Sequence, residues 1–230
     1  MYISHKYKII FVRIPKTACS SITDFLIRNI KDSDAVHSGV DDSKIAPTIV
    51  DDTKQKQVNP LLRSTSNKYV HYTLEDIINE GLIKATSLNQ YRCIGVIRDP
   101  VDRQKSMYYF RKKWNLRTKP SLQDYKNITI NNCTMRLSPI TGIQQSDFLM
   151  YNGVSYGNMW LYENIEKELP ALMKDLGLNS DHKLPKHKFG NRKTGEFNFD
   201  EEVMDSLKAH YHKDFKLYNE LKLGKQHASN

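Results

Sequence analysis

Three short apolar runs, each followed by an amphipathic segment, organise the chain. They are YKIIFVRI at residues 7–14, YRCIGVI at residues 91–97 and NMWLYE at residues 158–163. Their length and their β-branched and aromatic content are typical of buried strands. The segments that follow them repeat apolar residues at helical spacing. The alternation predicts an α/β fold with a mainly parallel central sheet flanked by helices.

Residues with capping chemistry mark the expected helices. Ser20 or Ser21 is expected to cap SITDFLIRNI, and Asp99, followed by a proline, to begin VDRQKSMYYFRKKW. The run TLEDIINEGL has the Thr-x-x-Asp start and the glycine stop of a short helix. Asn164 is expected to cap NIEKELPALMKDLGL, where an internal proline predicts a kink or a later start. Residues 199–223 have the pattern of one or two amphipathic helices.

Composition narrows the class of protein. The chain has 230 residues, of which 39% are hydrophobic and 27% are charged, so we expect one globular domain over residues 1–230. Residues from about 31 to 66 are polar and acidic, as in a long surface excursion. We find no apolar run long enough for a membrane span, no signal peptide and only three cysteines, and therefore expect a cytoplasmic protein. The net charge of +9 indicates an anionic partner.

The first predicted strand ends in RIPKTACSS, residues 13–21, which places a cation and hydroxyls at a helix start. Backbone N–H groups at a helix N-terminus attract phosphate, and Lys16, Thr17, Ser20 and Ser21 add a mobile charge and further donors. The glycines of the G-x-x-x-x-G-K-[ST] loop are missing and the lysine precedes the hydroxyls. This pattern favours a phosphate ester other than a nucleoside triphosphate with magnesium. The alternative is a capped turn with an exposed lysine.

The second predicted strand ends in a similar way, in VIRDPVDRQKS at residues 96–106. Arg98 can fork onto two phosphate oxygens, and Ser106, about two helical turns later, can donate another hydrogen bond. In the alternative interpretation, Arg98 forms a surface ion pair with Asp99 or Asp102. Because ligands bind at the carboxyl ends of parallel strands, two basic turns predict one ligand with phosphates at both ends.

Together the two segments resemble the paired signatures of sulfotransferases that use 3′-phosphoadenosine 5′-phosphosulfate (PAPS), in particular the heparan and uronyl 2-O-sulfotransferases. RIPKTACSS is similar to their R-V-P-K-T-A-x-T-S, and VIRDPVDRQKS to their V-I-R-D-P-x-x-R-x-x-S. QQSDFL, WLYENIEKELPALMKDLGL and LPKHKFGNRK also resemble the family. The resemblance implies a P-loop-NTPase-like three-layer fold. It also implies in-line transfer of a sulfuryl group from PAPS to an acceptor hydroxyl, on a carbohydrate, with 3′-phosphoadenosine 5′-phosphate (PAP) as product and no metal.

The resemblance also implies roles for individual residues. Lys16 would contact the phosphosulfate and stabilise charge on its bridging oxygen, and Arg13 would face the sulfate. The cradle of the 5′-phosphate would consist of Thr17, Ala18, Cys19, Ser20 and Ser21. The 3′-phosphate and the nucleotide would be held by Arg98, Ser106 and either Arg192 or Lys193. No glycine is required if Ala18 and Cys19 take the backbone angles of the turn.

Transfer to a hydroxyl requires a base, and histidine suits this role near neutral pH. His71, in NKYVHYTLED, resembles the histidine-bearing segment of the 2-O-sulfotransferases, although Val70 stands where a glycine is often found. The alternative is a structural or surface histidine. His37, in the polar excursion, and Glu75 are the further candidates for the base. We find no arrangement of metal ligands in the sequence.

Other functions are compatible with parts of this pattern. A non-catalytic protein that binds PAP, another polyanion or nucleic acid would use the net charge; as a polyanion binder it would show a steep salt dependence without special need for Lys16. No zinc finger, RNP motif or GXXG loop supports nucleic acid as partner. A small-molecule kinase would share the architecture but needs the glycine-rich loop. Residues 31–66 and 114–140 resemble no known segment, and we expect acceptor specificity in residues 31–66 and 119–140. A homo-oligomer is compatible with the resemblance, and no residue requires it.

Overall fold

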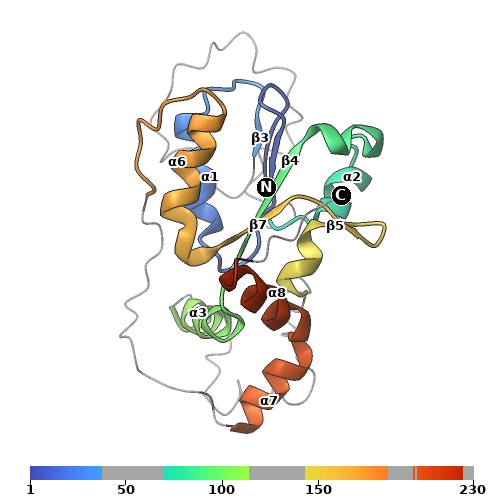
Figure 1. The fold of residues 1–230 in the computed structure, drawn as a ribbon, viewed down its shortest axis with the longest axis vertical. Coiled ribbons are helices and arrows are strands. Elements are labelled where there is room, and N and C mark those ends of the chain that lie inside the picture. Colours follow the sequence, from blue (N-terminus) through green and yellow to red (C-terminus); the bar gives the residue numbers. More distant parts are fainter. Residues whose placement is uncertain (38–69, 114–142, 186–198, 200, 225–230) are drawn as a thin grey trace.

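The computed structural model describes residues 1–37, 70–113, 143–185, 199 and 201–224, with the backbone alone described for 108–113. Five strands form a central sheet in the order β3-β1-β2-β4-β7 (Figure 1). Their bounds are Tyr2–Ser4 for β1, Ile9–Phe11 for β2, Val36–His37 for β3, Arg92–Ile97 for β4 and Asn158–Leu161 for β7. Strand β4 is parallel to β2 and β7, whereas β1 is antiparallel to β2 and β3. A separate hairpin joins β5 (Met150–Tyr151) and β6 (Val154–Ser155).

The sheet is mixed rather than mainly parallel. Strand β1, which the hydrophobic pattern did not predict, is joined to β2 by a short turn, and strands joined in this way pair antiparallel. Strand β3 lies at the edge of the sheet beside β1 and contains His37, which we expected in the polar excursion. The parallel part consists of β2, β4 and β7, the three strands that the apolar runs predicted.

Helices cover both faces of the sheet, as the alternating pattern predicts. One face packs against α1 (Cys19–Asn29) and α6 (Ile165–Asp175), which lie on the same side of the sheet in Figure 1. The other face packs against α2 (Leu74–Asn79) and the 3-10 helices η4 (Ala85–Gln90) and η5 (Gln145–Leu149). Because successive residues of a strand point to opposite faces, Ile9 and Phe11 belong to the first core and Ile10 to the second. The α/β fold with a central sheet flanked by helices is therefore confirmed.

Two helix starts have the predicted caps. The Thr73 hydroxyl accepts from the Asp76 N–H at 3.1 Å, and the Asp76 carboxylate accepts from the Thr73 N–H at 2.8 Å, which completes a capping box before α2. The Asp99 carboxylate accepts from the Asp102 N–H at 2.8 Å at the start of α3 (Pro100–Lys113). Both caps depend only on residues three positions apart, so local sequence is sufficient to predict them.

Helix α6 departs from its predicted start. Asn164 is the N-cap residue, but its side chain makes no capping hydrogen bond, because the 3-10 helix η6 (Tyr162–Asn164) leads into α6 and leaves Asn164 with near-helical angles. Pro170 lies inside α6, which continues on both sides of it. The buried positions Leu169 and Leu172 flank the proline, and their packing offsets the backbone hydrogen bond that proline cannot donate.

The C-terminal segment forms two helices, α7 (Glu201–His210) and α8 (His212–Lys222). Together with α3 they lie beyond the end of the sheet at which β4 ends (Figure 1). A small third core holds α3 to α7 through Met107, Val203, Leu207 and Tyr211. These helices close over the carboxyl ends of the parallel strands, where α/β proteins bind ligands. No helix among the described residues is both long and apolar enough to cross a membrane.

Candidate active site

The turn between β2 and α1 holds two residues in the left-handed backbone region. The φ angle is 67° at Lys16 and 61° at Ala18. This conformation costs a residue other than glycine roughly 1–2 kcal/mol, so surrounding contacts must maintain it. One such contact is the Thr17 hydroxyl, which donates to the Ile14 carbonyl oxygen at 2.8 Å. We expected Ala18 and Cys19 to adopt the unusual angles. Ala18 does so, but the second residue is Lys16, and Cys19 begins the helix.

The N-terminus of α1 has no side-chain cap. Its N-cap residue is Ala18, whose methyl group accepts no hydrogen bond, so the prediction that Ser20 or Ser21 caps the helix is wrong. Both serines lie inside the first turn, because the left-handed residue before Cys19 starts the helix earlier than the hydroxyl pattern indicated. The first turn also contains no acidic residue. The first N–H groups of α1, which a helix cannot satisfy internally, are therefore donors suited to an anion.

Arg13 lies under this turn and is only 1% exposed. Its guanidinium donates to the Thr23 hydroxyl at 3.0 Å and to the Ser20 hydroxyl at 3.1 Å, and both acceptors belong to α1. These contacts hold the first turn of α1 against the end of β2. The Arg13 guanidinium, which we expected to face the sulfate, therefore lies beneath the first turn of α1 and adds positive charge there.

His71 contacts the same segment from the other face of the sheet. Its Nδ1 atom lies 2.7 Å from the carbonyl oxygen of Arg13. Because a carbonyl oxygen only accepts, Nδ1 carries the proton, and in the neutral ring Nε2 keeps its lone pair. Burial lowers the pKa of His71 to about 3, with the positive charges of Arg13, the amino terminus and Arg103 acting in the same direction. The ring is therefore neutral near pH 7, the form in which it can accept a proton.

The other candidate bases have different surroundings. His37 is half-buried on the edge strand β3, where it pairs with Tyr2, two strands away from β2. Glu75 is exposed in the first turn of α2. His71, by contrast, has a hydrogen bond to the segment that precedes Lys16.

The lowered pKa of His71 predicts a specific pH dependence of folding. In the unfolded chain this ring takes up a proton near pH 6.5, whereas in the folded protein it does so only near pH 3, so acid favours unfolding. Above about pH 6.5 the contribution of His71 is constant, and below it stability is lost at up to about 1.4 kcal/mol per pH unit. We expect urea unfolding to show this loss of stability in wild type and to show less of it in His71→Asn, which has the same other titrating groups. An equal pH dependence of the two proteins would contradict the assignment.

The turn that follows β4 lies against the turn that follows β2. Arg98 follows β4 directly, and its Nη1 lies 3.4 Å from the carbonyl oxygen of Lys16. Its Nη2 lies 3.3 Å from the Asp102 carboxylate, and its guanidinium carbon lies 4.4 Å from the centre of the Tyr162 ring. The ion pair with Asp102, which we considered as the alternative interpretation of Arg98, is therefore present together with the contact to the first turn.

Asp102, the ion-pair partner of Arg98, is exposed enough for another anion to replace it. The Arg98 side chain is 10% exposed, whereas that of Asp102 is 49% exposed. Ion pairs with so exposed a carboxylate are worth little, so a phosphate can replace Asp102 at small cost. Ser106 follows Asp102 by four residues and therefore lies on the same side of α3, one turn further along. Ser106 thus lies on the side of α3 that carries Asp102, the ion-pair partner of Arg98.

Comparison with known proteins assigns the family. The sequence model of the Sulfotransferase family matches residues 1–219 of this chain. The chain belongs to the sulfotransferase family. The resemblance seen in the two loop segments is thereby confirmed at the level of the family, and family membership supports sulfotransfer as the activity. A similar solved structure is the crystal structure of a sulfotransferase from Alicyclobacillus acidocaldarius, with a TM-score of 0.41 and 14% sequence identity over 93% of this chain and 85% of that chain. No curated protein matches this chain with significant similarity.

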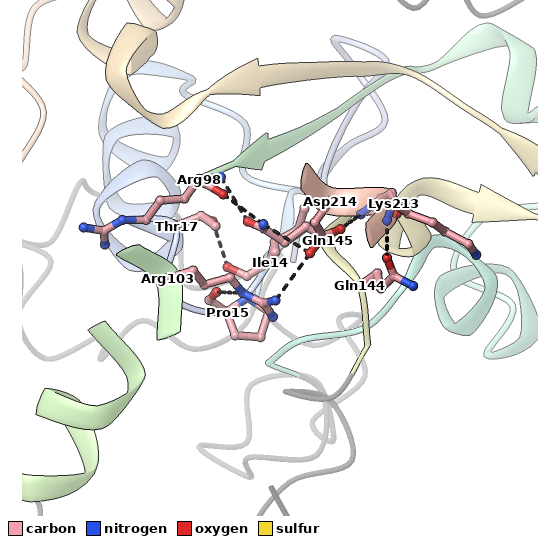
Figure 2. A network of polar contacts seen from close by, with 10 residues as sticks. Ile14, Pro15, Thr17, Arg98, Arg103, Gln144, Gln145, Lys213 and Asp214 are labelled. Atoms are coloured by element: carbon pink, nitrogen blue, oxygen red, sulfur yellow. Dashed lines mark hydrogen bonds and ion pairs between the residues drawn. The ribbon is translucent and has the colours of Figure 1, made fainter. Parts of the chain in front are cut away.

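In this sulfotransferase the two turns are joined by a network of buried polar side chains (Figure 2). Arg103 of α3 donates through Nε to the Pro15 carbonyl oxygen at 3.2 Å. The Gln145 amide pairs with the backbone of Arg98, accepting from its N–H at 3.0 Å and donating to its carbonyl oxygen at 2.9 Å. Asp214 of α8 lies between Arg103 and Gln145, 3.7 Å and 3.3 Å from their nitrogens. Burial raises the pKa of the Asp214 carboxyl, and Arg103 and the amide donors act against this shift.

Sequence analysis did not single out these three supporting residues. Arg103 had a signal, because it occupies the second arginine position of the V-I-R-D-P-x-x-R-x-x-S pattern that the family shows. Gln145 lies in the QQSDFL stretch that also resembles the family. Asp214 had none, because one acidic residue in a charged amphipathic helix is expected to be exposed, whereas here it is fully buried.

Three parts of the predicted site lie outside the described residues. One is the pair Arg192 and Lys193, of which either was expected to close over the nucleotide. The others are residues 38–66 of the excursion and residues 119–140, both expected to contribute to acceptor specificity. Within the described residues of this sulfotransferase, no group of three or more histidine, cysteine, aspartate or glutamate side chains is placed to hold a metal ion.

Proposed function

We propose that this sulfotransferase transfers the sulfuryl group of PAPS to a hydroxyl group of a carbohydrate. The observation that carries the proposal is the contact between the two anion-binding turns, where Arg98 Nη1 lies 3.4 Å from the Lys16 carbonyl oxygen. Two separate cation-bearing turns in contact suit one ligand with a phosphate at each end. The family match over residues 1–219 supports a single catalytic domain with a P-loop-like phosphate turn.

The donor groups in the site fit the two phosphates of PAPS. At the first turn, the N-terminus of α1 has no side-chain cap and can bind a phosphosulfate, and Lys16 precedes it with a positive charge. At the second turn, the buried Nε of Arg98 has no hydrogen-bond partner among the described residues, and its Nη2 contacts only a half-exposed carboxylate. A phosphate that displaces Asp102 would satisfy this guanidinium with two parallel hydrogen bonds.

The residues of the chain suggest how the transfer proceeds. PAPS, when bound, supplies an activated sulfuryl group joined to its 5′-phosphate. Lys16 stabilises the negative charge that develops on the bridging oxygen as the bond to sulfur breaks. His71 accepts the proton of the attacking hydroxyl on Nε2, while Nδ1–H keeps its bond to the Arg13 carbonyl and fixes the ring. Bound phosphates would counter the cations near His71 and so raise its pKa by the share those charges remove, whereas the larger share due to burial would remain.

A binding measurement tests the donor. We expect wild type to bind PAP much more tightly than 5′-AMP, which lacks the 3′-phosphate. Arg98→Ala is expected to weaken PAP binding about 10- to 100-fold, the loss of charge-assisted hydrogen bonds to one phosphate, and to weaken AMP binding much less. Isothermal titration calorimetry measures both ligands. Arg92→Ala is the matched control, because Arg92 begins β4, the strand that Arg98 follows, and its guanidinium pairs with the exposed Asp175.

Two outcomes would count against the proposal. Equal and weak binding of PAP and AMP, unaffected by Arg98→Ala, would refute PAPS as donor. Binding of PAP that falls steeply with salt and weakens equally in Arg92→Ala and Arg98→Ala would instead favour a non-catalytic polyanion-binding protein.

The acceptor class is tested separately by release of PAP from PAPS. Glycans containing uronic acid, neutral oligosaccharides and simple phenols are offered as acceptors. We expect the glycans to give the fastest release. Release only with phenols would refute a carbohydrate acceptor and leave the donor assignment intact.

A further inference from the structure

We propose that Asp214 is a positioning residue for both donor-binding turns, acting through Arg103 on the first and through Gln145 on the second; this inference rests on the proposed function. Asp214 lies in α8, more than a hundred residues along the chain from either turn. It is fully buried, and so is Gln145. None of the roles implied by the family resemblance falls on it.

The link to the first turn runs through Arg103. Its Nε donates to the carbonyl oxygen of Pro15, the residue immediately before Lys16, at 3.2 Å. Arg98 Nη1 contacts the carbonyl oxygen of Lys16 at 3.4 Å. The Lys16 backbone, with its φ of 67°, is thus held by an arginine on each side. Contacts of this kind are what a strained residue needs to keep its conformation.

The link to the second turn runs through Gln145. The pairing of β4 with β7 ends at Ile97, opposite Leu161. At the next residue, Arg98, the Gln145 amide takes the place of a neighbouring strand and bonds both backbone groups at 3.0 and 2.9 Å. The direction in which the Arg98 side chain leaves the sheet is therefore set by Gln145.

Asp214 joins these two links. One carboxylate oxygen lies 3.3 Å from Gln145 Nε2 and 3.7 Å from Arg103 Nη1, and the other accepts from the Ser146 N–H at 3.0 Å (Figure 2). A buried ion pair adds little net stability compared with apolar packing, because both charges lose their hydration. What it does provide is a fixed geometry, since each partner is costly to leave unpaired. The two turns, and hence the two phosphate positions, then move as one unit.

The variant Asp214→Asn tests the inference because it keeps the shape of the side chain and removes its charge. PAP needs both turns in register, whereas 5′-AMP needs only the first. We therefore expect the ratio of PAP to AMP affinity to fall about tenfold or more, the effect of losing one charged hydrogen bond. A purely structural role would lower the fraction of protein that binds, seen in the calorimetric stoichiometry, and would leave this ratio unchanged.

The neighbouring residue provides a matched control. Lys213 Nζ lies 3.2 Å from Asp147, so this exposed pair also joins α8 to η5, but it does not reach either turn. Lys213→Ala is expected to keep the wild-type ratio. Hydrogen exchange of the backbone amides around Lys16 and Arg98 is expected to be faster in Asp214→Asn and unchanged in Lys213→Ala.

A second variant keeps the test decisive if Asp214→Asn does not fold. Gln145→Met preserves volume but removes both bonds to the Arg98 backbone, and we expect it to lower the same affinity ratio. Wild-type ratios and exchange rates in the folded variants would overturn the inference while leaving the donor assignment in place. A wild-type protein that does not distinguish PAP from AMP would instead overturn the proposed function, and exchange would still report whether Asp214 holds the turns.

Discussion

Replacing His71 by asparagine is expected to lower kcat about 100- to 10,000-fold, the usual contribution of a general base. Asparagine can still donate a hydrogen bond to the Arg13 carbonyl, as His71 Nδ1 does at 2.7 Å, but it has no nitrogen that accepts a proton. PAP affinity is expected to stay close to the wild-type value, because none of the contacts we assign to the phosphates involves His71. Release of PAP from PAPS, with the acceptor that gives the fastest wild-type rate, measures the effect.

His37→Asn is the matched control, because His37 is half-buried on the distant edge strand β3 and was our second candidate for the base. We expect its kcat to remain near wild type. A large loss in His37→Asn and none in His71→Asn would transfer the role to His37. Normal rates in both variants would show that neither histidine removes the proton.

The second large effect is expected at Lys16. Lys16→Met should lower kcat about 100- to 1,000-fold, the typical loss when one group that stabilises developing charge is removed. Methionine has a similar length and the same difficulty as lysine in adopting the φ of 67°, so the backbone cost is matched. PAP binding should weaken much less than kcat, because the charge on the bridging oxygen develops only in the transition state. Steady-state kinetics and calorimetry on the same preparation separate the two effects.

Lys8→Met controls for the loss of a lysine in a strained turn. Lys8 also has a positive φ, 54°, but lies in the turn between β1 and β2, where its ammonium contacts the Tyr91 ring. We expect it to leave kcat unchanged. Similar losses in Lys8→Met and Lys16→Met would mean that only overall charge or stability matters, as expected for a general polyanion-binding surface.

Local sequence is sufficient to predict the elements that depend on neighbouring residues. The apolar runs predict β2, β4 and β7, and the caps at Thr73 and Asp99 are present as expected. These features arise from side chains one to four positions apart, so a local pattern contains the necessary information. The two loop segments also resemble the family to which the chain belongs, and each is contiguous with a strand end and a helix start, so a local pattern reveals it.

Features that form where distant segments meet could not be predicted from local sequence, because they depend on the tertiary structure. The left-handed angle at Lys16 is not evident from sequence, because lysine does not favour it and contacts from Arg98 and Arg103 maintain it. The antiparallel β1 and the edge strand that contains His37 depend on pairings whose stability is gained only when the sheet assembles. The burial of Asp214 beside Arg103 has the same origin. A charged residue remains in a core only where a partner from another segment meets it, and no local pattern specifies that meeting.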